Sequence, residues 1–202
     1  MRICVYGAAS TAIDTKYTDA VEDLCEKLAL NGHHLVFGAG DGGVMGAAAR
    51  GFRKGGGNVM GVAPDFFTNG TVEKIYPGCD ALVKTDSMGL RKSIMESNAD
   101  AFICGPGGIG TYDELFQILT LKQLKVFDKP IVIYNVAHFY DSFNTQLKLG
   151  MEEKFLRSDT PFLCRAFNEN QMDELINYIE TYDNNYTKNN GAAVDLVYGE
   201  ED

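Results

Sequence analysis

Two short stretches of this 202-residue sequence join residues that could bind an anion to residues that could catalyse a reaction. The first, GPGGIGTYDE, runs from Gly105 to Glu114 and contains four glycines, a threonine and two acids. The second, SMGLRKSIMES, contains Arg91 beside Lys92. Glycine lets a backbone approach a phosphate without a Cβ in the way, and a carboxylate facing a sugar can stabilise positive charge there. Both stretches are therefore candidates for one active site.

A second glycine run, GAGDGGVMG, occupies Gly38 to Gly46. The positions that match G-x-G-x-x-G are Gly38, Gly40 and Gly43 in this run, and Gly105, Gly107 and Gly110 in the other. With Asp65 downstream, the first match leaves a nicotinamide-dependent oxidoreductase open as an alternative. A dinucleotide fold normally carries this fingerprint after its first strand, where this chain has GAAST, and no GxxxxGK[ST] occurs. Tight turns and close helix packing also explain either run.

The charged residues also have purely structural interpretations. Thr111 and Glu114 fit T-x-x-E, in which threonine caps a helix and the glutamate bonds back to the cap. Arg91 and Lys92 could form a solvated helix face, with Lys92 paired to Glu96 one turn later. In the functional interpretation, Glu114 faces a ribose, and Arg91 holds a phosphate or polarises a leaving base.

Short apolar runs alternate with amphipathic stretches along the chain. Strands are predicted at 3–7, 34–38, 59–64, 81–85, 101–105 and 130–135, with FLCRAF as an edge strand. Helices are predicted in the stretches YTDAVEDLCEKLALNG, SMGLRKSIMES and DELFQILTLKQLKVF. This alternation is typical of an α/β, Rossmann-like, doubly wound parallel sheet in a single domain. We expect that domain to span residues 1–182, followed by an acidic, loosely ordered tail at 183–202.

Both glycine runs follow a predicted strand and open a predicted helix. In such sheets, ligands bind at the carboxyl ends of the strands, where helix N-termini offer free N–H groups and a positive dipole end. We therefore expect the two loops, including Gly40 and Gly43, to converge on one phosphorylated ligand.

Composition excludes several function classes. The net charge of −10 argues against nucleic acid and against an anionic membrane surface as partners. The five cysteines include no CxxC pair, which suggests reduced, buried thiols, and the three histidines show no metal-ligand spacing. No apolar run approaches the roughly 20 residues that span a bilayer. We expect a cytoplasmic protein without a metal or another cofactor.

Three segments in order resemble the LOG (Lonely Guy) family. They are GAGDGGVMG, MGLRK (Met88 to Lys92) and DAFICGPGGIGTYDEL (Asp100 to Leu115), and the similarity continues through TLKQL and DKPIVIYN. The family hallmarks are a GGGxxGLMG-like loop, an M-x-x-R-K element and PGGxGTxxE. Members often carry the label lysine decarboxylase, but no lysine here has the context of a pyridoxal-binding residue.

The resemblance implies a phosphoribohydrolase, which cleaves the N-glycosidic bond of a nucleoside 5′-monophosphate and in the best-known members frees cytokinin bases. It implies that Glu114 is the catalytic carboxylate, with Arg91 as its essential partner. The other substrate-binding positions that it implies are Gly107, Gly108, Gly110, Thr111, Lys92, Thr120 and Glu73. It further implies a homodimer or larger homo-oligomer with the site near the subunit interface.

Two positions depart from the family pattern. Gly89 stands where histidine usually follows the methionine, and GAAST replaces the common cysteine-glycine-serine-serine run. Neither departure removes Arg91 or Glu114. A nucleotide-binding or carrier protein without turnover is the alternative function, and it would bind nucleotides without releasing base.

Overall fold

The apolar runs of the sequence form seven strands of one sheet, all of them paired in parallel. A computed structural model describes residues 1–68 and 74–182, so Glu73 and the predicted loose tail at 183–202 lie outside the described residues. The strands are β1 (Arg2–Tyr6), β2 (His34–Phe37), β3 (Val59–Pro64), β4 (Ala81–Thr85), β5 (Ala101–Cys104), β6 (Ile131–Tyr134) and β7 (Arg165–Phe167). The Rossmann-like fold class is thereby confirmed, and FLCRAF supplies the edge strand β7.

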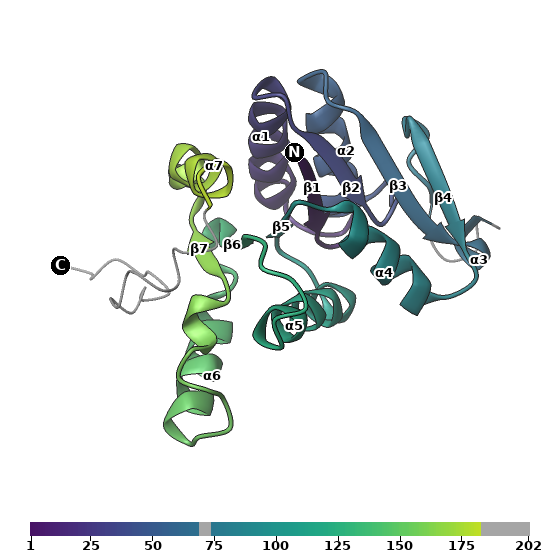
Figure 1. Cartoon of the computed structure of the whole chain (residues 1–202). Helices are drawn as coiled ribbons and strands as arrows, with labels where there is room; N and C mark the ends of the chain where they lie inside the picture. The colour runs from purple at the N-terminus through teal and green to yellow at the C-terminus, as the bar shows by residue number, and fades with distance from the viewer. Residues whose placement is uncertain (69–73, 183–202) are drawn as a thin grey trace.

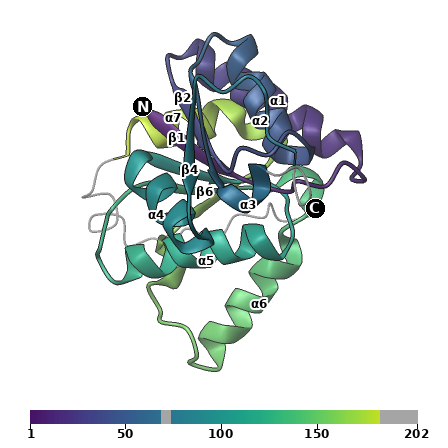
Figure 2. The ribbon, with the colours of Figure 1, turned by 90° about the vertical axis from the view of Figure 1, so that its right-hand side faces the viewer.

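The helices connect these strands on the two faces of the sheet. They are α1 (Thr15–Leu30), α2 (Gly43–Lys54), α3 (Asp65–Thr68), α4 (Met88–Asn98), α5 (Ile109–Gln123), α6 (Asp141–Glu152) and α7 (Met172–Glu180). Short 3₁₀ turns are η1 (Val136–His138), η2 (Thr160–Phe162) and η3 (Glu169–Gln171). Figures 1 and 2 show α1, α2 and α7 on one face of the sheet and α4, α5 and α6 on the other.

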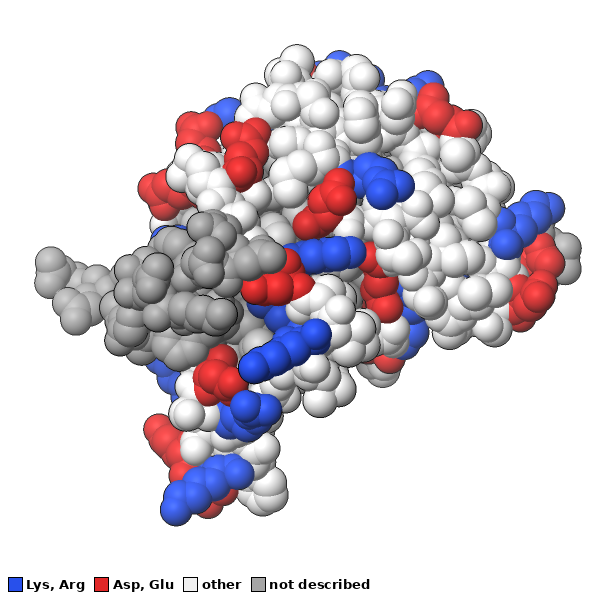
Figure 3. Space-filling model, in the orientation of Figure 1, with Lys and Arg blue, Asp and Glu red and all other residues white. Residues whose placement is uncertain are grey.

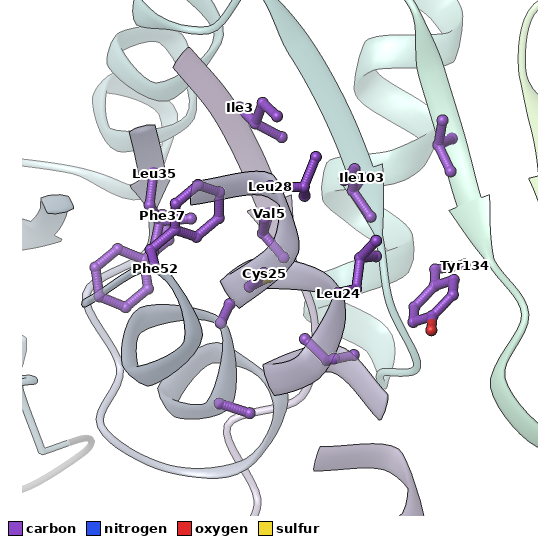
Figure 4. Packing of buried hydrophobic residues seen from close by; sticks show 14 of the residues in the cluster. Ile3, Val5, Leu24, Cys25, Leu28, Leu35, Phe37, Phe52, Ile103 and Tyr134 are labelled. Atoms are coloured by element: carbon purple, nitrogen blue, oxygen red, sulfur yellow. The ribbon is translucent and has the colours of Figure 1, made fainter. Parts of the chain in front are cut away.

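Two apolar layers hold the helices on the sheet, because alternate residues of each strand point to opposite faces. On the face of α1 and α2, Leu24 and Leu28 pack over Ile3, Val5 and their neighbours (Figure 4). On the other face, residues of α4, α5 and α6 pack against the intervening strand positions. The central strands β1, β2, β5 and β6 are buried on both faces, which is why they read as continuous apolar runs, whereas the edge strand β4 is largely exposed.

The strand order β4-β3-β2-β1-β5-β6-β7 places the topological switch point between β1 and β5. Tyr6 pairs with Cys104 in register at the carboxyl ends of these two strands. The backbone N–H of Ala8 then donates to the carbonyl of Pro106 at 3.0 Å. The loops after β1 and β5 therefore leave the sheet side by side, at the edge where ligands bind in this class of fold.

Local sequence sets where the two helices nearest this edge begin. Ser87 caps α4, because its hydroxyl accepts the backbone N–H of Leu90 at 3.2 Å. Gly108 is the N-cap of α5 and has no side chain to satisfy the helix amides. The first amides of α5 are consequently available to a ligand.

Charged residues of both signs lie next to one another on the face of the molecule in Figure 3. Several form ion pairs, including Arg50 with Glu22 at 2.8 Å and Arg53 with Asp80 at 2.9 Å. Across residues 1–68 and 74–182, no helix has the length and apolar character needed to cross a membrane.

Candidate active site

Arg91 of α4 and Glu114 of α5 meet under the carboxyl edge of the sheet. Both residues are buried, at 4% and 8% exposure, and Arg91 Nη1 donates to Glu114 Oε1 at 3.3 Å. The sequence predicts these two residues as the catalytic pair, and the fold brings them into contact although they are 23 residues apart.

Backbone carbonyls from two strand ends fix the other side of the Arg91 guanidinium. Nε donates to the carbonyl of Val62 in β3 at 3.1 Å, and Nη2 donates to the carbonyl of Gly38 after β2 at 3.1 Å. The guanidinium carbon also lies 5.6 Å from the centre of the Phe67 ring. A guanidinium has five N–H donors, so the bonds found in the described part of the chain leave two for a ligand.

The close approach of Arg91 explains the first glycine of GAGDGGVMG. A Cβ on Gly38 would lie 1.7 Å from Arg91 Nη2, so a side chain there would displace the guanidinium. Gly38 therefore acts in this site by making room for Arg91.

Lys92 forms a second ion pair parallel to the first. Its Nζ donates to both carboxylate oxygens of Asp113 in α5, at 2.8 and 2.9 Å. The ion pair that Lys92 forms is therefore with Asp113 of α5 and not, as the i+4 spacing suggests, with Glu96 of α4. The adjacent Arg91–Lys92 of one helix thus face the adjacent Asp113–Glu114 of the next.

The capping-box interpretation of Thr111 and Glu114 is also wrong. The N-cap of α5 is Gly108, so Thr111 is the third residue of the helix and Glu114 the sixth. A glutamate in this position lies beyond the cap. Its carboxylate is instead directed to Arg91.

The glycines at the start of α5 fall into two kinds. A Cβ on Gly107 would lie 2.1 Å from Thr111 Oγ1, so the packing of Thr111 requires a glycine there. A Cβ on Gly108 or Gly110 would meet no atom within 4 Å. Neither of these two is required by contacts within the chain, which leaves room for a bound group at the helix start.

A cavity of about 340 Å³ opens between these elements. Its lining among the described residues is Gly7, Ala8, Ala9, Ser10, Met45, Phe67, Met88, Arg91, Gly108, Gly110, Thr111, Asp113 and Glu114. One side thus presents the start of α5 and the two acids, and the other presents apolar side chains. Such an arrangement can hold an anionic group, a sugar and a flat apolar ring together.

The first glycine run reaches this cavity through Met45, while Gly40 and Gly43 have contacts elsewhere. Gly40 forms a β-bridge with Ile75, and Gly43 (φ +54°) begins α2 beneath the carbonyls of Ala8 and Ser10. The amide of Met45 in α2 already donates to the carbonyl of Ala8 at 3.2 Å. Within the described residues, Gly40 and Gly43 do not line the cavity, because the loop after β1 covers the start of α2.

Other predicted positions lie around the cavity. Thr120 is exposed on α5 and lines a separate surface hollow with Asp113 and Phe116. Lys92 and Gly107 are not part of the described lining, but each contacts a residue that is. Lys92 bonds to Asp113, and Gly107 lies next to Thr111. A Cβ on Gly89 would meet only the hydroxyl of Ser87, at 4.0 Å.

Three lining residues received little weight from sequence alone. These are Met45, Phe67 and Met88, none of which is among the site residues predicted above. Their only signal is that each follows a predicted strand end within a few residues, which is where cavity walls arise in this fold.

Cys104 lies next to the glycine loop that begins at Gly105. Burial raises the pKa of the Cys104 thiol beneath the loop to about 12, so it keeps its proton at neutral pH and is a poor nucleophile. Among the described residues, no group of three or more His, Cys, Asp or Glu side chains has the arrangement of a metal site.

Comparison with protein families and relatives gives consistent results. The family model described as "Possible lysine decarboxylase" matches residues 45–179. The cytokinin riboside 5′-monophosphate phosphoribohydrolase LOG2 of Arabidopsis thaliana is 33% identical over 189 residues, covering 93% of this chain and 88% of that protein. The enzyme LOG4 of the same plant is 35% identical over 163 residues, covering 78% and 73%.

Solved structures share the fold at lower identity. The molybdenum cofactor carrier protein of Chlamydomonas reinhardtii superimposes with a TM-score of 0.65 at 21% identity, covering 90% of this chain and 98% of that one. The molybdenum cofactor binding protein of Rippkaea orientalis superimposes with a TM-score of 0.63 at 22% identity, covering 89% and 97%. These structures bear on the fold alone.

Proposed function

Since this chain belongs to the LOG family, we propose that it hydrolyses the N-glycosidic bond of a nucleoside 5′-monophosphate. The products are the free base and ribose 5-phosphate, and a cytokinin riboside monophosphate or AMP is the substrate class. The observation that carries the proposal is the buried Arg91–Glu114 pair beside a cavity that the amides of α5 also face.

The 5′-phosphate binds at the start of α5 in this proposal. Gly108 and Gly110 have no Cβ to block an anion, and the helix dipole and the first amides favour negative charge. Thr111, buried at 4% exposure in the same turn, adds a hydroxyl to the lining. Binding energy from the phosphate, which does not react, fixes the ribose relative to the catalytic pair.

Glu114 and Arg91 then act on the ribose and the base. As the bond from C1′ to the base nitrogen lengthens, positive charge develops on the sugar, and the Glu114 carboxylate stabilises it and orients the attacking water. Water adds its oxygen to C1′, one of its protons passes to the departing base, and the C1′–N bond breaks. Arg91 orients Glu114 through Nη1, and its remaining donors contact the substrate.

The apolar wall of Met45, Phe67 and Met88 supports a flat ring as the leaving group. The volume of about 340 Å³ lies at the small end of the range for ligand cavities, about 300–1,000 Å³, which favours a mononucleotide over a dinucleotide. No lysine lines the described part of the cavity, which disfavours pyridoxal-dependent decarboxylation.

Base release by wild type and Glu114→Gln tests the proposal. AMP and isopentenyladenosine monophosphate are incubated with each protein, and free base is measured by chromatography. We expect the variant to be slower by about 10²–10³-fold, the scale for loss of one electrostatic stabiliser. Glu22→Gln is the matched control, because it removes a carboxylate on α1 that pairs with Arg50 of α2, away from the cavity. This variant should release base at the rate of wild type.

A wild-type protein no faster than Glu114→Gln across a panel of nucleotides would overturn the enzymatic proposal. If nucleotides then raised the melting temperature without base release, the protein would be a nucleotide carrier. A nucleotide-binding protein without turnover is the alternative that the sequence leaves open, and this measurement distinguishes it from the enzyme.

We also propose that two copies pair beside the cavity. Ile109 is 90% exposed at the first position of α5, and Phe116 follows two turns later on the same helix face. Sedimentation of wild type should give a dimer or larger species, which Ile109→Lys weakens. A monomeric wild-type protein would contradict this arrangement.

A further inference from the structure

The connection from β6 to α6 holds backbone in an unfavourable conformation. Ala137 (φ +49°) and His138 (φ +60°) are consecutive left-handed residues that are not glycine. Such residues persist only where their surroundings fix them. Here the Glu169 carboxylate accepts the Ala137 N–H at 3.2 Å, and the His138 ring lies 3.2 Å from the Asp141 carboxylate.

Asn135 anchors the same connection from inside the protein. It is fully buried, and its Oδ1 accepts the backbone N–H of Tyr140 at 2.7 Å. Its Nδ2 donates to Asp141 at 2.9 Å and to Asn168 at 3.2 Å. The left-handed turn and Asn135 together fix the backbone of Tyr140.

The Tyr140 side chain reaches from this turn to the glycine loop. It is 1% exposed, and its hydroxyl donates to the carbonyl of Gly105 at 2.8 Å. The hydroxyl also lies 3.3 Å from the sulfur of Cys104, and the ring packs edge-to-face on Tyr112 of α5 at 5.9 Å.

Gly105 is the residue at which the loop leaves β5. Its N–H donates to the carbonyl of Tyr6 at 2.9 Å, and the carbonyl of Pro106 accepts from Ala8 at 3.0 Å. With the bond from Tyr140 to the Gly105 carbonyl, three hydrogen bonds hold the backbone of the Gly105–Pro106 segment. Two residues further on, Gly108 lines the cavity and caps α5.

We propose that Tyr140 is a positioning residue, which holds the loop amides in the orientation that binds the substrate phosphate. This role rests on the proposed function. Without the hydroxyl, the buried carbonyl of Gly105 loses its strong donor, because the Cys104 thiol lies 4.0 Å away and is a weak one. The loop then relaxes toward other orientations, and the phosphate meets amides that are not preorganised.

Tyr140→Phe keeps the ring and removes only this hydrogen bond. We expect the KM for a nucleoside 5′-monophosphate to rise about tenfold, while kcat changes by less than about threefold. Hydrogen exchange of the peptide covering 105–112 should quicken in the ligand-free protein. Tyr134→Phe is the matched control, since Tyr134 is equally buried and its hydroxyl donates to Ala20, in the opposite apolar layer.

The two measurements separate failure of this role from failure of the proposed function. If wild type releases no base, hydrogen exchange still tests the positioning role of Tyr140. Faster exchange in Tyr140→Phe but not in Tyr134→Phe supports that role. Unchanged exchange in 105–112 overturns it, whatever the activity. A loss confined to kcat, or an equal change in Tyr134→Phe, also overturns it.

Discussion

At the scale of one residue, Arg91 has a structural role, and the proposed function gives it a chemical role as well. Its guanidinium satisfies two buried carbonyls, of Val62 and Gly38, and contacts the carboxylate of Glu114. Removal of one partner of a buried ion pair leaves an uncompensated charge, which commonly costs about 3–5 kcal/mol. Loss of activity in an Arg91 variant is therefore expected to combine lost contacts to substrate with lost stability.

A double-mutant cycle separates these two roles. We expect Arg91→Met to lower the free energy of unfolding by about 3–5 kcal/mol, because it removes the cation beside the buried Glu114 carboxylate. Glu114→Gln should lower it less, by about 1–3 kcal/mol, because glutamine and the carbonyls of Val62 and Gly38 still accept from the guanidinium. In Arg91→Met/Glu114→Gln, part of the loss should return, because no charge is left buried. Urea unfolding at fixed protein concentration measures each value. Strict additivity would contradict the pairing.

The sequence predicts Arg91 and Glu114 because their motifs are short and specific. It cannot predict that Gly38 makes room for Arg91, since a pattern along the chain does not say which strand ends become neighbours. Lys92 illustrates the same limit. The i+4 spacing suggests Glu96, but the packing of α4 beside α5 offers Asp113.

At the scale of one element, the start of α5 contains a glycine that the packing of the fold requires and others that we propose contact the ligand. Gly107 has no room for a methyl group beside Thr111, and Gly110 has open space. Substitution by alanine should therefore act oppositely on stability at these two positions.

Gly110→Ala should raise the free energy of unfolding by up to about 1 kcal/mol, the gain in helix propensity, and weaken nucleotide binding, because the methyl enters the cavity. Gly107→Ala should lower the free energy of unfolding by about 1–3 kcal/mol, the usual cost of overpacking. Thermal unfolding with and without AMP measures both effects. A Gly110→Ala protein that bound AMP like wild type would argue against the phosphate position.

Element boundaries were less predictable than element types. The strands follow from apolar runs, but the T-x-x-E pattern suggests a helix start at Thr111, whereas α5 begins at Ile109 after a glycine cap. The loop after β1 covers α2 through a bond from the amide of Met45 to the carbonyl of Ala8. No local pattern announces such a contact, so the sequence could not predict that Met45 of this run, rather than Gly40 or Gly43, lines the described part of the cavity.

At the scale of the whole molecule, four buried thiols couple stability to alkaline pH. Burial raises the pKa of Cys4, Cys25, Cys104 and Cys164 above the ordinary value of 9.0, to about 12 for the last two. Above pH 9 the unfolded chain releases these protons and the folded chain keeps them. The stabilisation is complete below pH 9 and is lost as the pH rises toward the folded pKa values.

Lys122 acts in the opposite direction. Burial lowers its pKa from 10.5 to about 8, although Asp128 lies nearby, so between these values the folded state binds fewer protons than the unfolded state. Its contribution to stability therefore rises with pH over this range.

Urea unfolding between pH 8 and 10.5 should show a net fall in the free energy of unfolding above pH 9. Each thiol contributes about 1.4 kcal/mol per pH unit, and Lys122 offsets about one of them. Cys25→Ala should make the fall in the free energy of unfolding with pH less steep, by the contribution of about one proton. Lys122→Met should make that fall steeper. Parallel slopes for all three proteins would contradict this linkage.

The contacts of Arg91 also bear on how the protein reaches its native state. Its acceptors come from residues 29 and 53 positions earlier in the chain and 23 positions later. Contacts between distant segments form late, since long loops must close first. During refolding the central strands and α5 must all be docked before the guanidinium finds its partners. Formation of the Arg91 contacts would therefore mark the last stage of assembly rather than early collapse.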